Sequence, residues 1–249
     1  HRDISRELFR LDFAWAGPAP RPGQFFLIKP KRSAVFLGRP ISVAAWEPER
    51  EGFLIARRGR GTGELDDLYA GEEAELTGPL GNAWGDFPPP VNRESADAGV
   101  VALVGGGAGI APLRFLAAEL PPRSFDFYAG FRFLRGEAEA EEILGPAPRR
   151  GRETVVAAEQ GGGGRPGRIT GFIDPARYAA IYACGPEAML KALSAAAAAA
   201  GRPCFVSLER PMACAVGACL GCTVRTRGGN RRCCTEGPIF DAQELIFDD

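Results

Sequence analysis

Five of the seven cysteines lie close together near the C-terminal end of the chain, and their spacing is typical of an iron-sulfur site. Cys214-x4-Cys219-x2-Cys222 is followed by the adjacent pair Cys233 and Cys234. Three thiolates from one tight loop and a fourth from farther along the chain form the ligand pattern of plant-type 2Fe-2S centres. The pattern therefore predicts a 2Fe-2S cluster held by the first three cysteines and one of the adjacent pair.

Two other interpretations of this cluster remain open. One is a structural zinc site, which more often shows two C-x2-C pairs, and the other is a set of reactive thiols without metal. Spacing does not choose between Cys233 and Cys234, because adjacent side chains of an extended chain face opposite ways. The crowding of the cysteines differs from a secreted disulfide framework and predicts a reducing, cytoplasmic compartment.

A second set of residues has the chemistry of a flavin phosphate site. In Arg39-Pro40-Ile41-Ser42, the arginine offers a charged fork for a phosphate and the serine offers a hydroxyl. The glycine-rich stretch 57–63 is expected to be a turn with many backbone donors, suited to a pyrophosphate. The tetrapeptide alone is equally well explained as a barrel corner with a surface arginine. The order of these two segments before a third glycine run favours a flavin.

The third set predicts a nicotinamide nucleotide site at the edge of a parallel sheet. The glycine run joins a buried strand to a helix N-terminus, where unpaired N–H groups favour a phosphate. It departs from G-x-G-x-x-G because Ile110 occupies the sixth position, and the second strand supplies no ribose-binding acid. A later strand ends at the carboxyl edge where ligands bind. Each segment alone is also explained as a tight turn. The candidate residues are Gly105, Gly106, Gly107, Gly109, Cys184, Gly185 and Pro186.

The elements that must position these sites follow from periodicity. Short apolar runs at 24–28, 41–45, 53–56 and 73–77, broken by Gly and Pro, favour a six-stranded antiparallel β-barrel over 1–98. A doubly wound α/β domain is expected over 99–206, with strands at 100–104, 124–128, 154–158 and 181–184 and helices at 110–120, 137–144 and 187–200. The remaining 207–249 is expected to form a small cluster-binding lobe. A turn at 78–82, a linker over 88–95 and a loop at 161–164 complete this interpretation.

Composition excludes several classes of function. The net charge of −1 over 249 residues provides no general field for nucleic acid or an anionic membrane. No run approaches the roughly 18 apolar residues of a membrane span. His1 is the only histidine, which removes most Ser-His-Asp and Cys-His mechanisms. Electron transfer needs no such histidine.

The three predicted sites together describe an electron chain. A nicotinamide exchanges two electrons as hydride, a 2Fe-2S centre exchanges one, and a flavin does both, so the flavin must stand between them. The chain has no length left for a substrate barrel, and no base candidate stands out. The cluster must therefore exchange electrons with a protein partner.

The motifs recur in one known family. The whole chain resembles the electron-transfer subunit of class B dihydroorotate dehydrogenase, within the ferredoxin reductase-like flavoproteins. The resemblance rests on the segments 22–26, 39–42, 59–62, 105–113, 184–189, 212–222 and 234–240, of which the cysteine-rich tail is the most specific.

This resemblance implies FAD in the barrel, a 2Fe-2S cluster in the tail and NAD⁺ as the final acceptor. Electrons would come from a separate FMN-containing catalytic subunit that oxidises dihydroorotate in pyrimidine biosynthesis, in a heterotetramer with two subunits of each kind. By position, it implies FAD contacts from Arg39, Pro40, Ile41, Ser42, Ile55, Ala56, Arg57, Gly61 and Thr62. It implies cluster ligation by Cys214, Cys219, Cys222 and Cys234, with Cys233 where the family usually has an apolar residue.

Three alternatives remain open. The nearest is the small subunit of an NADH-dependent ferredoxin:NADP⁺ oxidoreductase or of a sulfide dehydrogenase, with another partner. The second is a zinc-bearing scaffold without redox activity. The third is a stand-alone ferredoxin-like carrier, which would not need some two hundred residues ahead of its cluster.

Overall fold

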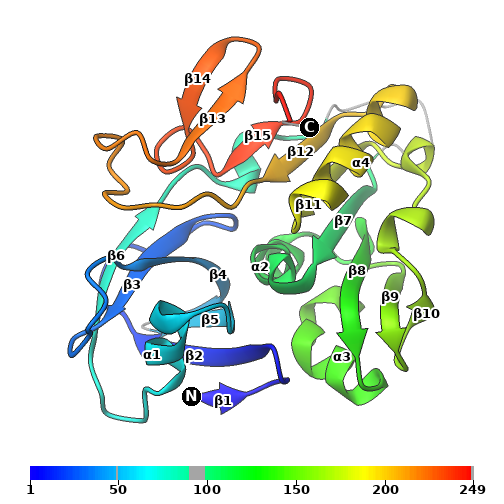
Figure 1. Cartoon of the computed structure of the whole chain (residues 1–249). Coiled ribbons are helices and arrows are strands. Elements are labelled where there is room, and N and C mark those ends of the chain that lie inside the picture. Colours follow the sequence, from blue (N-terminus) through cyan, green and yellow to red (C-terminus); the bar gives the residue numbers. More distant parts are fainter. Residues whose placement is uncertain (49, 90–98, 248–249) are drawn as a thin grey trace.

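Two β-sheets, one antiparallel and one mostly parallel, organise the chain (Figure 1). The computed structural model describes residues 1–48, 50–89 and 99–247. The antiparallel sheet is the blue and cyan part, the parallel sheet is green to yellow, and the cysteine-rich tail, in orange, lies beside both. The predicted division at residue 98 and most of the predicted linker lie outside the described residues.

The antiparallel sheet has six strands in the order β1-β2-β5-β4-β3-β6. Phe9, Phe26 and Phe53 are fully buried in the core that it encloses. The four predicted apolar runs and the predicted number of six strands are confirmed, whereas the positions of β1 and β2 had not been predicted. The strands are β1 (Arg2–Asp3), β2 (Leu8–Ala14), β3 (Phe25–Pro30), β4 (Arg39–Glu47), β5 (Arg50–Ala56) and β6 (Ala74–Leu80).

The predicted turn at 57–63 was wrong in its second half, because helix α1 (Arg60–Asp66) begins there. The Thr62 hydroxyl accepts the backbone N–H groups of Arg58 at 2.9 Å and Gly59 at 3.2 Å, which stabilises the start of the helix. Leu65 is buried and anchors the helix to the core of the antiparallel sheet. These two contacts outweigh the low helix propensity of the glycines.

The second sheet has seven strands in the order β10-β9-β8-β7-β11-β12-β15, all parallel except β15. Predicted strand 124–128 was too short, since β8 continues through exposed residues while it pairs with β9 as far as Leu134. The strands are β7 (Val101–Gly106), β8 (Phe125–Leu134), β9 (Thr154–Gly161), β10 (Arg165–Pro166), β11 (Ala180–Cys184), β12 (Cys204–Ser207) and β15 (Ile239–Asp241).

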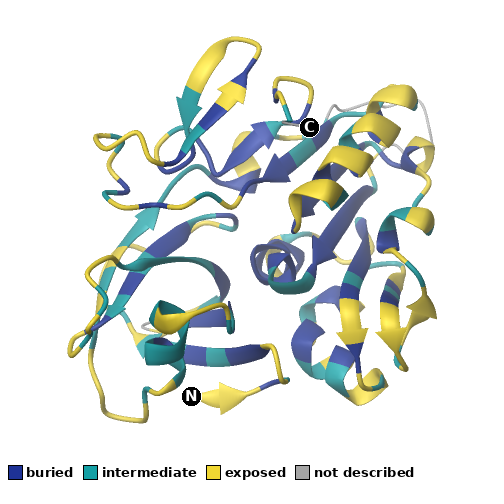
Figure 2. Cartoon of the chain, viewed as in Figure 1, coloured by how far each residue is buried: buried dark blue, intermediate teal, exposed yellow. Residues whose placement is uncertain are grey.

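Helices cover both faces of this sheet, which confirms the doubly wound prediction. Leu103 packs with α2 (Ile110–Glu119) and α3 (Glu137–Leu144) on one face, and its neighbour Val104 packs with α4 (Glu187–Ala199) on the other. Figure 2 shows α2 and the central strand β7 as largely buried. Short 3-10 helices lie at Trp84–Asp86, Gly107–Gly109, Ala147–Arg150, Ile169–Gly171 and Pro175–Arg177. Within the described ranges, no helix combines the length and apolar character needed to cross a membrane.

The cysteine-rich tail is held by elements outside it. Its hairpin of β13 (Thr223–Thr226) and β14 (Gly229–Arg232) stands apart from the large sheets, but β15 pairs antiparallel with β12. Asn82, just after β6, donates to the carbonyls of Glu236 and Ile239 at 3.1 and 2.8 Å and accepts the N–H of Ile239. The tail therefore shares its core with the parallel sheet, as its poverty in apolar residues requires.

Candidate functional site

A cavity of about 420 Å³ lies where the antiparallel sheet, the parallel sheet and the cysteine-rich tail meet. We call it the flavin pocket. Seven of the nine residues predicted for FAD line it, together with the wall 207–212 that leads to Cys214. The seven are Arg39, Pro40, Ile41, Ser42, Ile55, Ala56 and Thr62. The pocket thus collects residues from β4, β5 and α1 that are distant in sequence.

Arg39 has the properties expected of a phosphate-binding side chain in this pocket. Its Nη2 donates to the carbonyl of Leu37 at 2.7 Å, while its buried Nε has no hydrogen-bond partner among the described residues. A Cβ placed on Gly61 would lie 2.9 Å from that Nε, so only glycine lets α1 approach so closely. An unpaired buried donor is costly. The donor set therefore fits an anionic group, such as the pyrophosphate of FAD.

Two of the predicted FAD residues do not line the flavin pocket. Gly61 lies behind Arg39, as described above. Arg57 lines the neighbouring cavity, and its guanidinium binds the Asp66 carboxylate, with Nε–Oδ2 at 2.6 Å, and the Ser5 carbonyl at 2.7 Å. These contacts, with a further ion pair to Asp3, raise the pKa of Arg57. In this structure Arg57 joins β2, β5 and α1.

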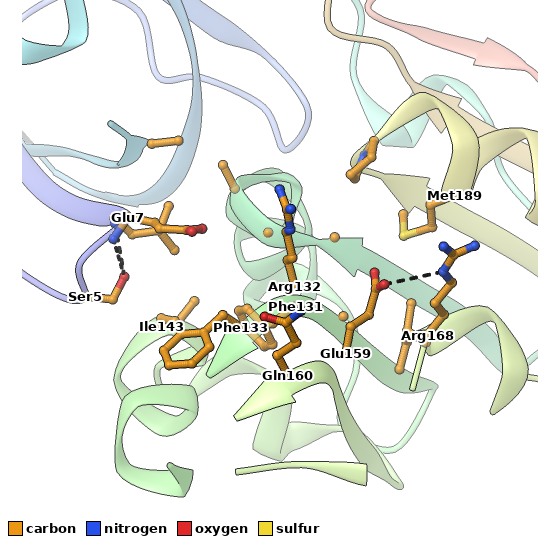
Figure 3. A pocket seen from close by; sticks show the side chains of 18 of the residues that line it. Ser5, Glu7, Phe131, Arg132, Phe133, Ile143, Glu159, Gln160, Arg168 and Met189 are labelled. Carbon is orange, nitrogen blue, oxygen red and sulfur yellow. Dashed lines mark hydrogen bonds and ion pairs between the residues drawn. The ribbon is translucent and has the colours of Figure 1, made fainter. Parts of the chain in front are cut away.

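A larger cavity of about 830 Å³ opens at the carboxyl ends of β7, β8 and β9 (Figure 3). We call it the nucleotide pocket. Of the predicted nicotinamide-site residues, Gly106, Gly107 and Pro186 line it. The position agrees with the rule that ligands of open α/β sheets bind outside the carboxyl ends of strands.

The other four predicted residues shape the two pockets in different ways. Gly105 and Gly109 are buried, and a Cβ on Gly109 would lie 2.2 Å from the carbonyl oxygen of Cys184. The β7–α2 turn therefore packs directly against the end of β11. Gly185 adopts a positive φ of 154° beside Gly106, and Cys184 lines the flavin pocket. Burial raises the pKa of Cys184, so its thiol stays protonated.

The two pockets share part of their walls. Ala56, Arg58 and Ala108 line both cavities. A nucleotide in one pocket and a flavin in the other would therefore both contact these three residues. Hydride transfer between two bound cofactors requires such neighbouring sites.

The cysteine loop brings sulfur atoms together through the hairpin that follows it. Because Thr223 of β13 pairs with Arg232 of β14, Cys222 and Cys234 come close, and the N–H of Cys234 lies 3.4 Å from Cys222 Sγ. The N–H of Cys219 lies 3.3 Å from Cys214 Sγ. The pKa of Cys214 is lowered to about 6, chiefly by the N–H of Val216 and next by that of Cys219. Donors aimed at sulfur stabilise thiolates.

The two adjacent cysteines point in different directions. The Cys233 thiol is fully buried and donates to the carbonyl of Leu208 at 3.3 Å. Burial raises its pKa to about 12, so it is held as a neutral thiol. Cys234 lies instead beside Cys222, with the N–H of Gly217 directed at its sulfur. Among the described residues, Cys214 thus lies against Cys219 and Cys222 against Cys234, and the chemistry of these four thiols suits the ligand set of an iron-sulfur cluster.

Several residues of both pockets had not been singled out from the sequence. Glu159 and Gln160, near the carboxyl end of β9, line the nucleotide pocket together with Arg168. A signal for them existed, because the carboxyl end of any strand in a parallel sheet borders the ligand site. The wall 207–212 had no such signal, since only the packing of the tail brings it to the flavin pocket.

Comparisons with known proteins agree with this arrangement. A solved NADH-dependent reduced ferredoxin-NADP oxidoreductase superposes with a TM-score of 0.76 at 25% identity, covering 98% of this chain and 87% of that one. A ferredoxin reductase of carbazole 1,9a-dioxygenase superposes with a TM-score of 0.64 at 23% identity, covering 81% and 64%. The fold is therefore that of the ferredoxin reductase-like proteins, with an added cysteine-rich tail.

Sequence relatives narrow this class to one family. Residues 209–246 match the iron-sulfur cluster binding domain of dihydroorotate dehydrogenase B. The electron transfer subunit of dihydroorotate dehydrogenase B (NAD(+)) from Clostridium acetobutylicum is 38% identical, over 92% of this chain and 87% of the relative. That from Caldanaerobacter subterraneus subsp. tengcongensis is 37% identical, over 99% and 96%. The chain belongs to the family of dihydroorotate dehydrogenase B electron transfer subunits, as predicted.

Proposed function

We propose that this chain carries electrons between a dihydroorotate-oxidising partner subunit and NAD⁺, through a 2Fe-2S cluster and FAD. In this proposal residues 1–98 bind FAD, 99–206 bind NAD and 207–249 bind the cluster. The observation that carries it is the wall 207–212, which lines the flavin pocket and runs directly into the cysteine loop at Cys214. The family membership supports the same function.

The order of the sites supports the direction of electron flow. The cysteine loop lies on one side of the flavin pocket, and the nucleotide pocket lies on the other, joined through Ala56, Arg58 and Ala108. The flavin pocket would hold FAD, whose chemistry would link one-electron exchange with the cluster to two-electron exchange with NAD⁺. The chain itself binds and orients these groups, and no described side chain is needed as a general base.

Within this function, the predicted residues that line the pockets or lie in the cysteine-rich tail have roles that their positions support. Arg39, Ser42 and Thr62 would bind the FAD phosphates, while Ile41, Ile55 and Ala56 would contact its ring system. Gly106, Gly107 and Pro186 would hold the NAD phosphates at the β7–α2 turn. Cys214, Cys219, Cys222 and Cys234 would ligate the cluster, and Cys233 would pack in the core beside it.

The surface around the cysteine loop supports docking of the partner there. Val216 and Leu220 are 66% and 58% exposed, and both belong to the loop that carries Cys219. Leu220 also adopts a positive φ of 59°, a conformation that costs energy for a branched side chain. Exposed apolar residues mark interaction surfaces. We propose that an FMN-containing catalytic subunit covers this loop, in an assembly with two copies of each subunit.

Reconstitution tests this function. The chain loaded with FAD and cluster is mixed with a dihydroorotate dehydrogenase catalytic subunit of the FMN type, and reduction of NAD⁺ is followed at 340 nm after dihydroorotate is added. We expect NADH formation that requires both proteins. Leu220→Asp should weaken assembly in analytical ultracentrifugation, while Tyr69→Asp, at an exposed residue between α1 and β6, should not. No NADH formation with an assembled, fully loaded pair would overturn the proposal.

The alternative function, as a subunit of an NADH-dependent ferredoxin:NADP⁺ oxidoreductase, is favoured only by the similarity of the fold. The NADH-dependent reduced ferredoxin-NADP oxidoreductase superposes well, but at 25% identity. The relatives named above are 37 to 38% identical over nearly the whole chain. In the reconstitution, reduction of NADP⁺ by ferredoxin in place of dihydroorotate-dependent NADH formation would favour the alternative.

A further inference from the structure

Glu159 is the one carboxylate of the nucleotide pocket that stands at the open edge of the parallel sheet. Glu7 and Glu139 also line this pocket. Glu7 lies across it, just before β2 of the antiparallel sheet (Figure 3). Glu139 is tied to its own surroundings, because its carboxylate accepts the backbone N–H of Arg135 at 2.7 Å and the Nε of the same residue at 3.1 Å. Glu159, by contrast, ends β9, where a bound nucleotide would pass.

The place of Glu159 in the pocket follows from the topology. The sheet reverses its strand order between β7 and β11, and a dinucleotide binds across such a switch point with its phosphates at the turn after β7. The nicotinamide half must face the flavin pocket, which Cys184 at the end of β11 lines. The adenosine half therefore extends the other way, over the carboxyl ends of β8 and β9, toward Glu159.

Glu159 is paired with a cation from the segment that follows β10, the strand paired with β9. Its Oε2 lies 3.5 Å from the Nε of Arg168, which precedes the 3-10 helix at Ile169–Gly171, and Figure 3 shows the two side chains facing each other. Both residues line the nucleotide pocket, as does Arg132 of β8. Without the carboxylate, the two arginines would form a basic pocket of the kind that binds phosphate.

We propose that Glu159 selects the 2′-hydroxyl form of the coenzyme and masks a phosphate site formed by Arg168. This inference rests on the proposed NAD role of the pocket and assigns its specificity. A carboxylate accepts hydrogen bonds from the vicinal hydroxyls of the adenosine ribose and repels a 2′-phosphate. Its ion pair also occupies Arg168, the residue that would otherwise neutralise that phosphate. The acid that the second strand lacks is thus supplied by the third strand of the domain.

Binding of adenosine fragments tests this assignment without the redox reaction. AMP and adenosine 2′,5′-bisphosphate are titrated into the full chain, loaded with FAD and cluster, by isothermal titration calorimetry. We expect the wild-type chain to bind AMP at least about tenfold more tightly than the bisphosphate, since one unfavourable charge contact is worth about 1.4 kcal/mol. Glu159→Gln should bring the two affinities to within about threefold or reverse their order. Glu159→Gln combined with Arg168→Gln should lose the gained affinity for the bisphosphate.

Glu153→Gln is the matched control, because Glu153 directly precedes β9 and pairs with Arg165 outside the nucleotide pocket. The side chains of Glu153 and Glu159 are 44% and 46% exposed. The Glu153→Gln variant should prefer AMP over the bisphosphate as strongly as the wild type does. This result would exclude a general effect of removing one negative charge. An unchanged preference in Glu159→Gln would overturn this inference alone, as would a gain that survives loss of Arg168. Failure of the wild-type chain to bind AMP and NAD⁺ would overturn both this inference and the proposed NAD site.

Discussion

The adjacent residues Cys233 and Cys234 direct their side chains to different places, and only Cys234 is a proposed cluster ligand. Cys233 directs its thiol to the carbonyl of Leu208, inside the core shared with the parallel sheet. Cys234 faces Cys222 at the mouth of the loop. The alternation of an extended chain predicts that only one of them can reach a cluster, and the hairpin places Cys234 beside Cys222, which supports Cys234 as the proposed ligand.

Cys234→Ser should therefore lose the cluster, whereas Cys233→Ser should retain it. Serine replaces a thiolate ligand poorly, but at position 233 its hydroxyl can still donate to the Leu208 carbonyl. Iron and sulfide content, with the low-temperature EPR spectrum after dithionite reduction, measure the outcome. Retention of the cluster in Cys234→Ser together with its loss in Cys233→Ser would reverse the assignment.

Arg39 should govern how tightly the chain holds FAD. Removing a charge-assisted hydrogen bond to phosphate costs about 1.5–3 kcal/mol, so Arg39→Ala should weaken FAD binding by roughly tenfold to a hundredfold. Fluorescence of FAD released on dilution gives the dissociation constant. Arg32→Ala, at an exposed arginine between β3 and β4 that does not line the flavin pocket, is the control. Equal FAD retention by the two variants would remove Arg39 from the phosphate site.

Among the elements, the junction between β6 and the tail matters most for the site. Asn82 makes three side-chain hydrogen bonds to the segment 236–239, just beyond Cys234. A turn was predicted at 78–82, but its contact with residues more than 150 positions away had no sequence signal. Such a contact is set by the packing of the whole chain.

Asn82→Ala should lower the free energy of unfolding by about 2–3 kcal/mol, because the buried N–H and carbonyl groups it serves lose their partners. It should also shorten the lifetime of the cluster in air, since the segment after Cys234 is released. Urea unfolding and the decay of visible absorbance measure the two effects. Asn230→Ala, on the exposed strand β14, should change neither. Unchanged cluster lifetime in Asn82→Ala would mean that this junction does not support the loop.

The pairing of β8 with β9 contains a buried charge that gives a pH-dependent prediction. Asp126 accepts hydrogen bonds from Arg152 at 2.9 Å and from the Tyr178 hydroxyl at 3.0 Å. Burial raises the pKa of this carboxyl. The hydrogen bonds from Arg152 and Tyr178 lower the pKa by more than burial raises it, so the pKa lies below its ordinary value. A carboxyl whose pKa is lower in the folded chain than in the unfolded chain stabilises the fold. This stability is complete at pH values above the pKa of the unfolded chain, about 4, and it is lost as the pH falls through the pKa of the folded chain.

Asp126→Asn should therefore be less stable than the wild type by about 2 kcal/mol at pH 7, with one charge-assisted pair removed. The difference should shrink as the pH falls below about 4, where Asp126 of the unfolded wild-type chain becomes protonated, until the pH passes the lower pKa of the folded carboxyl. Denaturant unfolding at a series of pH values measures it. A difference that stays constant down to pH 3 would show that the charge of Asp126 does not stabilise the fold.

Much of this element order could be predicted because local signals were strong. The apolar run at 100–104 and the helix 137–144 follow from residues that are buried on both faces or on one stripe. The end of β8 could not be predicted from the sequence, because Arg132 and Phe133 are exposed. These residues keep their strand conformation through the pairing of β8 with β9. Helix α1 was missed because its glycines indicated a turn, while the Thr62 cap and buried Leu65 stabilise a helix.

At the scale of the whole molecule, function arises from the meeting of three parts. The sequence identified the cysteine loop, Arg39–Ser42 and the glycine turn, because each has its own chemistry. Ala56 was expected at the flavin, but no sequence signal indicated that Ala56, Arg58 and Ala108 line both pockets, since only the packing of the two sheets brings them together. The arrangement explains why one chain can join a one-electron carrier to a two-electron carrier.

Anaerobic titration of the purified chain with NADH tests this central claim most directly. Visible absorbance follows the flavin, and EPR follows the reduced cluster in the same samples. We predict about one FAD and two irons per chain, with electrons from NADH appearing in both centres. Cys234→Ser should show flavin reduction without the cluster signal. A wild-type chain that contains neither iron nor flavin, or whose cluster stays oxidised while its flavin is fully reduced, would contradict the account.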